Sequence, residues 1–254
     1  MTNLKFGWFD AVDVPSPLNK IEVYTAGSAD FLSLYAVEVD GKILVNSNVT
    51  PPNLPSIPAT GASVGTEQGF SIVTYTGTGS AGTIPHRLTQ DPEFVIFKQR
   101  NNEDDWRIFH KFLDDDEPQD YYLMLQSANG KSGDQNQSFM NRIPPTGPVI
   151  HLGTDSAING SSTTMVAYSW HSVPGLQKFG FYNGNGSSDG PFIELGFKPA
   201  IVWVKRTDST TDNWYINDST RDPFNVTGSS LKANLDRAEA TTGASFSATW
   251  DILS

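Results

Sequence analysis

Short apolar runs, separated by glycine, asparagine, proline and other polar residues, recur along the chain. Runs rich in β-branched and aromatic residues lie at 21–26, 31–39 and 42–46, and Asp40-Gly41 between the last two predicts a hairpin turn. Further strand candidates lie at 70–76, 93–98, 106–112, 121–126, 148–152, 163–171, 178–183, 200–206 and 213–217. Only Leu231 to Ala240 has helix-like spacing. Short strands at this spacing predict an all-β protein, an antiparallel sandwich or barrel.

One pattern occurs twice in the chain. The first copy contains Tyr75–Ser80, Pro92–Lys98 and Asp104–Trp106, and the second contains Tyr182–Ser187, Pro199–Lys205 and Asp212–Trp214. The offset is 182 − 75 = 107 at the tyrosine, 199 − 92 = 107 at the proline and 214 − 106 = 108 at the tryptophan. Because this period exceeds the roughly 20 to 50 residues of solenoid and propeller repeats, we expect each copy to be a half-domain or small domain, and the protein to be built by internal duplication.

Proline and small polar residues mark a predicted boundary at 47–68, where four prolines lie too close together for a helix or a central strand. We therefore predict a partial β-sandwich segment at 1–46, a linker at 47–68 and a duplicated domain at 69–254. Its copies span 69–172 and 176–254, and the second is short by a strand or two. Either the chain is a piece of a longer protein, or a neighbouring chain supplies the missing sheet edge.

Charge and composition narrow the class of partner. The 17 basic and 28 acidic residues give a formal net charge of −11, which argues against nucleic acid and anionic membranes as partners. No cysteine is present, so disulfides and thiolate metal ligands are excluded. No stretch approaches the roughly 18 apolar residues of a membrane-spanning helix. We expect neither nucleic-acid binding nor membrane insertion.

Two glycine- or acid-rich segments have simple structural explanations. Gly77-Thr-Gly79-Ser-Ala-Gly82 has the spacing of a dinucleotide-binding loop, but no helix pattern follows it, so we predict a hairpin turn. Asp114-Asp-Asp-Glu117 could bind calcium through its carboxylates, although a solvated turn explains it better. The four histidines lack metal-ligand spacing. We therefore expect no cofactor, and calcium stays as the alternative.

Carbohydrate binding is the activity for which the chain offers candidate residues. Trp106, Trp214 and Tyr215 could stack on sugar rings, with Asp212 and His110 as neighbouring polar groups. The two tryptophans occupy equivalent places in the repeat, which a role in the core explains more simply. Both explanations stay open at the level of sequence.

Several of these segments together resemble a known family. They are Gly69–Gly77, Pro92–Lys98 and Asp104–His110, with the second set through Arg206-Thr-Asp-Ser-Thr and Trp214-Tyr215. They resemble a domain of uncharacterised function found in structural proteins of marine tailed phages, especially cyanophages. Leu34–Asn46 looks like the last strands of the laminin-G or concanavalin-like sandwich that often precedes it.

The resemblance implies a concanavalin-like jelly roll in a virion structural protein. Such a protein would form part of a tail fibre or other surface appendage of the phage particle. It would be a homo-oligomer that contacts other virion proteins and a host-surface glycan, and it would not be an enzyme, because the family carries no catalytic residues to transfer. The alternatives are a spike-borne polysaccharide-degrading enzyme, which needs two convergent carboxylates, and a purely architectural decoration or spacer module.

Overall fold

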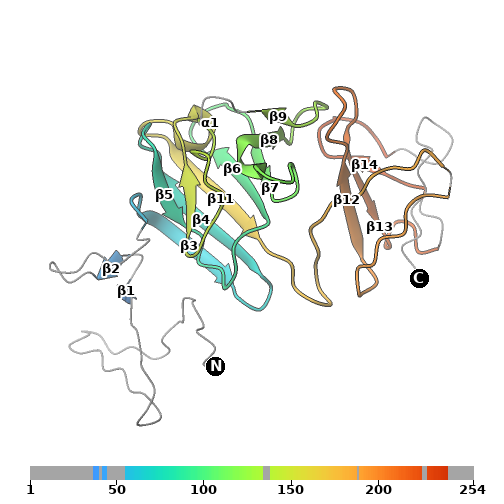
Figure 1. Ribbon diagram of the computed structural model, residues 1–254, viewed down its shortest axis with the longest axis horizontal. Helices are drawn as coiled ribbons and strands as arrows, with labels where there is room; N and C mark the ends of the chain where they lie inside the picture. The colour runs from blue at the N-terminus through green and yellow to red at the C-terminus, as the bar shows by residue number, and fades with distance from the viewer. Residues whose placement is uncertain are drawn as a thin grey trace, which may run out of the picture.

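The computed structural model describes residues 37–39, 42–44, 55–133, 138–187, 189–224 and 228–239, with the backbone alone for the first two ranges (Figure 1). In these residues the fold is all-β and every strand pairing is antiparallel, which confirms the predicted class. We call residues 55–172 the first unit and residues 176–239 the second unit.

The first unit is built on a seven-stranded sheet with the order β3-β4-β11-β6-β7-β8-β9. These strands span Ala59–Gly65 (β3), Phe70–Thr76 (β4), Thr164–Trp170 (β11), Phe94–Gln99 (β6), Arg107–His110 (β7), Tyr121–Met124 (β8) and Ser132–Gly133 (β9). A second layer contains the pair β5 (Gly82–Pro85) and β10 (Val149–Leu152), and the short helix α1 (Ser156–Asn159) also contacts β6. A 3-10 turn, η1 (Pro118–Asp120), precedes β8.

The second unit carries a smaller sheet, with the order β12-β13-β14. Its strands are β12 (Ile201–Lys205), β13 (Trp214–Asp218) and β14 (Leu231–Lys232). A separate hairpin near the N-terminus pairs β1 (Val37–Val39) with β2 (Lys42–Leu44), and this pairing confirms the hairpin predicted around Asp40-Gly41. The predicted strand at 21–26 lies outside the described residues.

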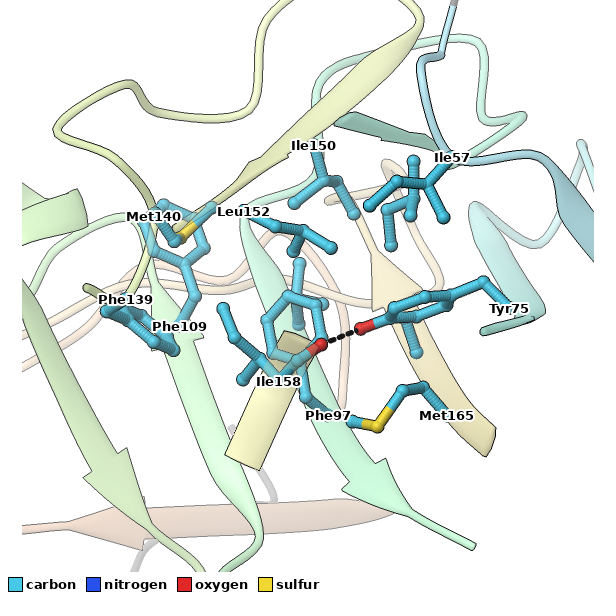
Figure 2. Packing of buried hydrophobic residues seen from close by; sticks show 13 residues of the cluster. Ile57, Tyr75, Phe97, Phe109, Phe139, Met140, Ile150, Leu152, Ile158 and Met165 are labelled. Atoms are coloured by element: carbon cyan, nitrogen blue, oxygen red, sulfur yellow. Dashed lines mark hydrogen bonds between the residues drawn. The ribbon is translucent and has the colours of Figure 1, made fainter. Parts of the chain in front are cut away.

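Both faces of the central part of the seven-stranded sheet are buried. One face packs against the β5–β10 layer to form the inner core, whose members include Tyr75, Phe97, Phe109, Ile150, Ile158 and Met165 (Figure 2). The Tyr75 hydroxyl donates a hydrogen bond of 2.5 Å to the Ile158 carbonyl, so its polar end is satisfied inside the core. The opposite face carries a second cluster, the aromatic cluster, built from Phe94, Ile96, Ile108, Leu113, Leu123 and Trp214.

Burial on both faces explains the continuous apolar sequence of β6. Residues 94 to 97 are all buried, with alternate side chains in the inner core and in the aromatic cluster. A strand with one solvated face would alternate between apolar and polar residues, whereas a strand covered on both sides reads as an unbroken apolar run.

The glycine-rich loop does not form a hairpin turn, so that prediction is wrong. It carries the chain from β4 in the large sheet to β5 in the second layer. Gly79 has φ +71°, and a Cβ on Gly77 would meet the Gly160 carbonyl oxygen at 2.2 Å. The buried Asn159 side chain accepts from the Thr78 N–H and donates to the Ser80 carbonyl, at 2.8 and 2.7 Å. The glycines therefore permit close packing on the end of α1.

Three further segments differ from their sequence patterns. Strand β3 lies within the predicted 47–68 linker, of which residues 47–54 are outside the described part. Its small, mostly exposed side chains occupy the edge of the sheet, where an apolar pattern is not needed. The predicted strand at 178–183, which the offset of 107 aligns with β4, is irregular. The helix-like segment starting at Leu231 begins with β14 instead.

The sequence repeat coincides with a repeated local structure. Strands β6, β7 and β8 have counterparts in β12, β13 and β14, and the pair Phe94↔His110 becomes Ile201↔Asp218 after 94 + 107 = 201 and 110 + 108 = 218. Similarly, the pair Ile108↔Leu123 becomes Ile216↔Leu231, since 108 + 108 = 216 and 123 + 108 = 231. The register of the three-stranded meander is thus the same in both units.

Hydrogen bonds at the turns of the two meanders also correspond. Lys98 Nζ donates to the Asp104 carbonyl at 2.6 Å, and Lys205 Nζ to the Asp212 carbonyl at 2.7 Å. Two amide side chains at equivalent positions accept from the tryptophan backbones. The Gln126 side chain accepts from the backbone N–H of Trp106 at 3.1 Å, and the Asn234 side chain accepts from the backbone N–H of Trp214 at 3.0 Å. The origin of this likeness by duplication stays a prediction.

Candidate functional site

The candidate site is the junction between the units, where the β12–β13 hairpin packs against the aromatic cluster of the large sheet. Trp214 is the anchor: it is 4% exposed, and its indole Nε1 donates a hydrogen bond of 3.0 Å to the Met124 carbonyl. Trp203 lies beside it, with ring centroids 5.3 Å apart, and reaches Phe94 of the first unit at 5.9 Å. An aromatic side chain that buries its ring and satisfies its N–H contributes strongly to such a contact.

Backbone and lysine contacts hold the turn of the β12–β13 hairpin against the first unit. The Lys131 N–H donates to the Thr207 carbonyl at 2.8 Å, and Lys205 Nζ donates to the Ala128 carbonyl at 2.9 Å. Burial lowers the pKa of Lys205, and nearby Asp212 opposes this shift. A Cβ on Gly130 would lie 2.2 Å from the Thr207 oxygen, so this close approach requires glycine.

Trp106 and His110 lie at the margins of the same cluster. Trp106 is partly buried there, and Lys98 Nζ lies 5.9 Å from its ring centroid. The His110 ring packs 5.8 Å from Phe94, and its Nδ1 accepts from the Phe112 N–H at 3.1 Å. Burial lowers the pKa of His110 to about 4, with Glu93 opposing the shift, so the ring is neutral at pH 7 and acts as an aromatic packing group.

Tyr215 faces away from Trp214, since neighbouring residues of a strand point to opposite sides of the sheet. Lys232 Nζ lies 5.3 Å from its ring centroid, and burial, followed by the charge of Asp212, raises the pKa of Tyr215. Asp212 accepts from Arg206 Nη1 at 3.3 Å at the hairpin turn. Of the five candidate residues, Trp106, Trp214 and His110 therefore share the aromatic cluster, and Tyr215 with Asp212 lies outside it.

The burial of Trp214 leaves little of its ring for a ligand. The half-buried Trp106 and Tyr215 keep part of their surfaces accessible. Glycan binding by the five residues as a set stays a prediction.

The sequence patterns missed the main surface feature of the second unit. Twelve large apolar side chains are exposed in the described part of the chain, and ten of them belong to the second unit. These ten are Leu176, Phe181, Tyr182, Phe192, Ile193, Ile201, Trp203, Phe224, Leu231 and Leu235. Phe192 and Phe224 are the most exposed, at 81% and 79%.

The acidic segment at 114–117 is a turn held by its own backbone. Asp114 Oδ1 accepts from the N–H groups of Asp116 and Glu117, each at 3.2 Å, and Oδ2 pairs with Lys131 Nζ at 3.2 Å. Within the described ranges, no group of three or more His, Asp or Glu side chains could hold a metal ion. Nothing in this geometry favours calcium here.

None of the helices in the described ranges is long and apolar enough to cross a bilayer. No curated protein and no solved structure gives a significant match to the chain. The family model for a domain of unknown function, DUF7483, matches residues 48–254, which is most of the chain. The chain therefore belongs to the DUF7483 family.

Proposed function

We propose that this chain is a non-enzymatic structural module of a phage particle, placed in a tail fibre or other surface appendage, and that its second unit contacts neighbouring protein chains. The resemblance of the repeated segments to phage structural proteins supports the setting. The observation that carries the structural role is the concentration of exposed apolar side chains on the second unit. Proteins that work as free monomers rarely keep many such groups in contact with water, and extended apolar surface is typical of protein interfaces.

Several charged groups of the first unit support this role because they are engaged in structural contacts. Asp155 caps α1 by accepting from the Ala157 N–H at 2.9 Å, and its other oxygen lies 3.4 Å from Arg107 Nε. Asp104 accepts from the Gln99 amide at 2.7 Å. These carboxylates orient loops and strand ends, which is a framework role.

Sedimentation velocity over a wide range of protein concentration tests the assembly role. We expect the chain to associate, and the triple substitution Phe181→Ser, Phe192→Ser and Phe224→Ser to weaken that association. The control is Ile143→Ser, which removes a side chain of the first unit that is 38% exposed. A chain that stays monomeric at all concentrations, alone and when mixed with purified appendage proteins, would contradict the proposal.

A second candidate function is glycan attachment through the Tyr215 side of the small sheet. Asp212 lies near Tyr215, and the Asn234 amide donates to Asn213 Oδ1 at 2.8 Å beside it. An aromatic ring flanked by carboxylate and amide groups suits sugar recognition.

Co-sedimentation of the chain with host-cell envelopes, followed by an assay for released reducing sugar, separates the functional classes. For an adhesin, we expect the envelopes to remove the chain from the supernatant without sugar release, and Tyr215→Ala to abolish this removal. Sugar release would identify a polysaccharide-degrading enzyme. If the folded chain stays in the supernatant, only the structural role remains.

A further inference from the structure

We propose that the outer edge of β12 is a docking site for one extended segment of a neighbouring chain. This segment pairs antiparallel with Ile201–Lys205 and has the alternation of aromatic and small residues that β11 has in the first unit. The inference deepens the proposed assembly role and rests on it. It is carried by three features: the direction of the β12 backbone groups, the pairing of β6 and the exposure of two side chains.

The register of the hairpin determines which backbone groups of β12 point outward. The Ser219 N–H donates to the Ala200 carbonyl at 3.0 Å, in the same register as the pair Val202↔Asn217. Because hydrogen-bonded pairs alternate along an antiparallel ladder, Val202 turns its N–H and C=O toward β13, and Ile201 and Trp203 turn theirs away. Strand β12 is an edge strand of the sheet formed by the described residues, which hold no backbone partner for these outward groups.

The first unit shows what covers the equivalent edge. Strand β6 corresponds to β12, and its outer edge is paired with β11 throughout. There Trp170 lies opposite Phe94, Tyr168 opposite Ile96 and Val166 opposite Lys98. The same pairing on β12 places aromatic residues of the incoming strand beside Ile201 and Trp203, and an aliphatic residue beside Lys205. Small residues, like Ala167 and Ser169 of β11, occupy the other face.

Side-chain exposure also indicates that the outer edge of β12 is uncovered. Phe94 and Ile96, which lie opposite Trp170 and Tyr168 of β11, are 5% and 6% exposed. Their counterparts Ile201 and Trp203 are 61% and 39% exposed. An apolar edge strand without proline or charge at its centre is a template for another strand, and native folds cover such edges.

The surroundings of the edge favour a single extended segment over the sheet of a second folded copy. The backbone N–H of Lys131 already donates to the Thr207 carbonyl, so the first unit occupies the edge beyond Lys205. Phe94 of the first unit lies against Trp203. The open length is therefore that of β12 itself. Addition of one strand to such an edge is a common mode of peptide recognition, in which the backbone supplies affinity and alternate side chains supply specificity.

A synthetic peptide with the sequence of residues 162–172, which contains β11, is a suitable probe. We expect it to slow amide hydrogen exchange at Ile201 and Trp203 of the full chain by about tenfold or more. The register turns the Tyr168 N–H toward β6, because the Arg100 N–H donates to the Thr164 carbonyl in the same ladder. N-methylation of the peptide at Tyr168 should therefore abolish the protection. N-methylation at Ala167, whose N–H points the other way, should preserve it.

Disulfide trapping tests the register directly, because the chain contains no cysteine. In the equivalent pairing Ser169 lies opposite Val95, the counterpart of Val202. Such a non-hydrogen-bonded pair has Cα atoms about 4.5 Å apart, within disulfide range. Val202→Cys should form a disulfide with the peptide that carries Ser169→Cys. It should not form one with the Tyr168→Cys peptide, whose side chain lies on the opposite face.

Three results would overturn strand docking. One is slow exchange at Ile201 and Trp203 in the dilute monomer without peptide, because the chain's own residues would then cover the edge. Another is protection that rises with protein concentration alone, which would assign the edge to a second copy. The third is equal behaviour of the two N-methylated peptides. If docking fails while the chain still associates in sedimentation, the structural role survives, whereas a strictly monomeric chain removes that role.

Discussion

Trp214 connects the two units through one side chain. Its ring completes a cluster otherwise built from the first unit, and its N–H satisfies the Met124 carbonyl. It is the one large apolar residue of the second unit that is buried in the described ranges. Removing it would leave a cavity and also an unpaired carbonyl.

We expect Trp214→Ala to lower the free energy of unfolding of the junction by about 3–5 kcal/mol, the usual cost of truncating a buried aromatic residue. Urea unfolding followed by far-UV circular dichroism measures it. Trp214→Phe is the control, since it keeps most of the ring and loses the hydrogen bond. An unchanged midpoint for Trp214→Ala, together with loss of glycan binding, would instead make this residue a ligand contact.

His86 is buried in its neutral form. Its Nε2 lies 2.5 Å from the Gly147 carbonyl, and its Nδ1 accepts from the Leu88 N–H at 3.1 Å. These contacts suit a ring that carries its proton on Nε2. Burial lowers its pKa to about 4, with the Gly147 hydrogen bond opposing the shift and the charge of His171 adding to it. A second proton would have to sit on Nδ1, facing the Leu88 N–H.

The lowered pKa makes the fold acid-sensitive. Its contribution to stability is fully present above the unfolded pKa of about 6.5 and is lost as the pH falls toward about 4. We expect His86 alone to cost roughly 2 kcal/mol between pH 7 and pH 5. Urea unfolding at several pH values measures this slope, and His86→Gln, which keeps a donor near Gly147, should flatten it. An equal slope in both proteins would contradict the assignment.

At the scale of elements, the loop after β8 positions the second unit. Residues 128–131 receive the Lys205 ammonium and donate to the Thr207 carbonyl, so this loop and the β12–β13 turn form one contact. Gly130 permits it because a side chain there would collide with the backbone of the turn. The contact is local to the junction, and residues 128–131 are not part of the inner core.

Gly130→Ala should separate the units without unfolding the first. A methyl group at Gly130 would lie 2.2 Å from one carbonyl oxygen and 2.7 Å from another, so the turn must move away. Limited proteolysis should then cut the second unit faster while residues 55–172 stay resistant. Gly133→Ala is a matched control, since its methyl group would meet the Tyr121 ring at an ordinary 3.5 Å. Equal digestion of the two variants would show that this contact does not hold the units together.

At the scale of the whole molecule, the two units differ in how much core they have. The first unit has a two-layer inner core, and the second depends on Trp214 and its contact with the first. A sheet of three short strands with one anchored side chain has little independent stability.

We therefore expect unfolding in two steps, with the second unit first. Amide exchange in increasing urea should release β12 and β13 before β4 and β11, because only the latter pair belongs to the inner core. Addition of a strand partner at the β12 edge should reduce the difference in urea concentration between the two steps. A single cooperative transition for all strands in the isolated chain would contradict this picture.

The pattern of residues by itself predicted most of the longer strands, the β1–β2 hairpin and the equivalence of the two meanders. Side-chain period and β propensity act over a few residues, so segments such as Pro92–Lys98 and Pro199–Lys205 carry this information locally. The sequence also allowed two roles for Trp214. The sequence does not distinguish these roles, because the burial of Trp214 depends on the side chains that the first unit places around it.

Only the tertiary structure decided which strands are neighbours. Strand β11 lies between β4 and β6, so residues more than sixty positions apart in the chain complete each other's hydrogen bonds. Residues 178–183 occupy the position of β4 in the repeat but form no strand, and the described part of the second unit contains no counterpart of β11 to pair with them. Edge strand β3 lacks an apolar pattern but forms because β4 supplies a partner for its backbone. A β-strand needs a partner for its backbone, and that partner is a property of the whole fold.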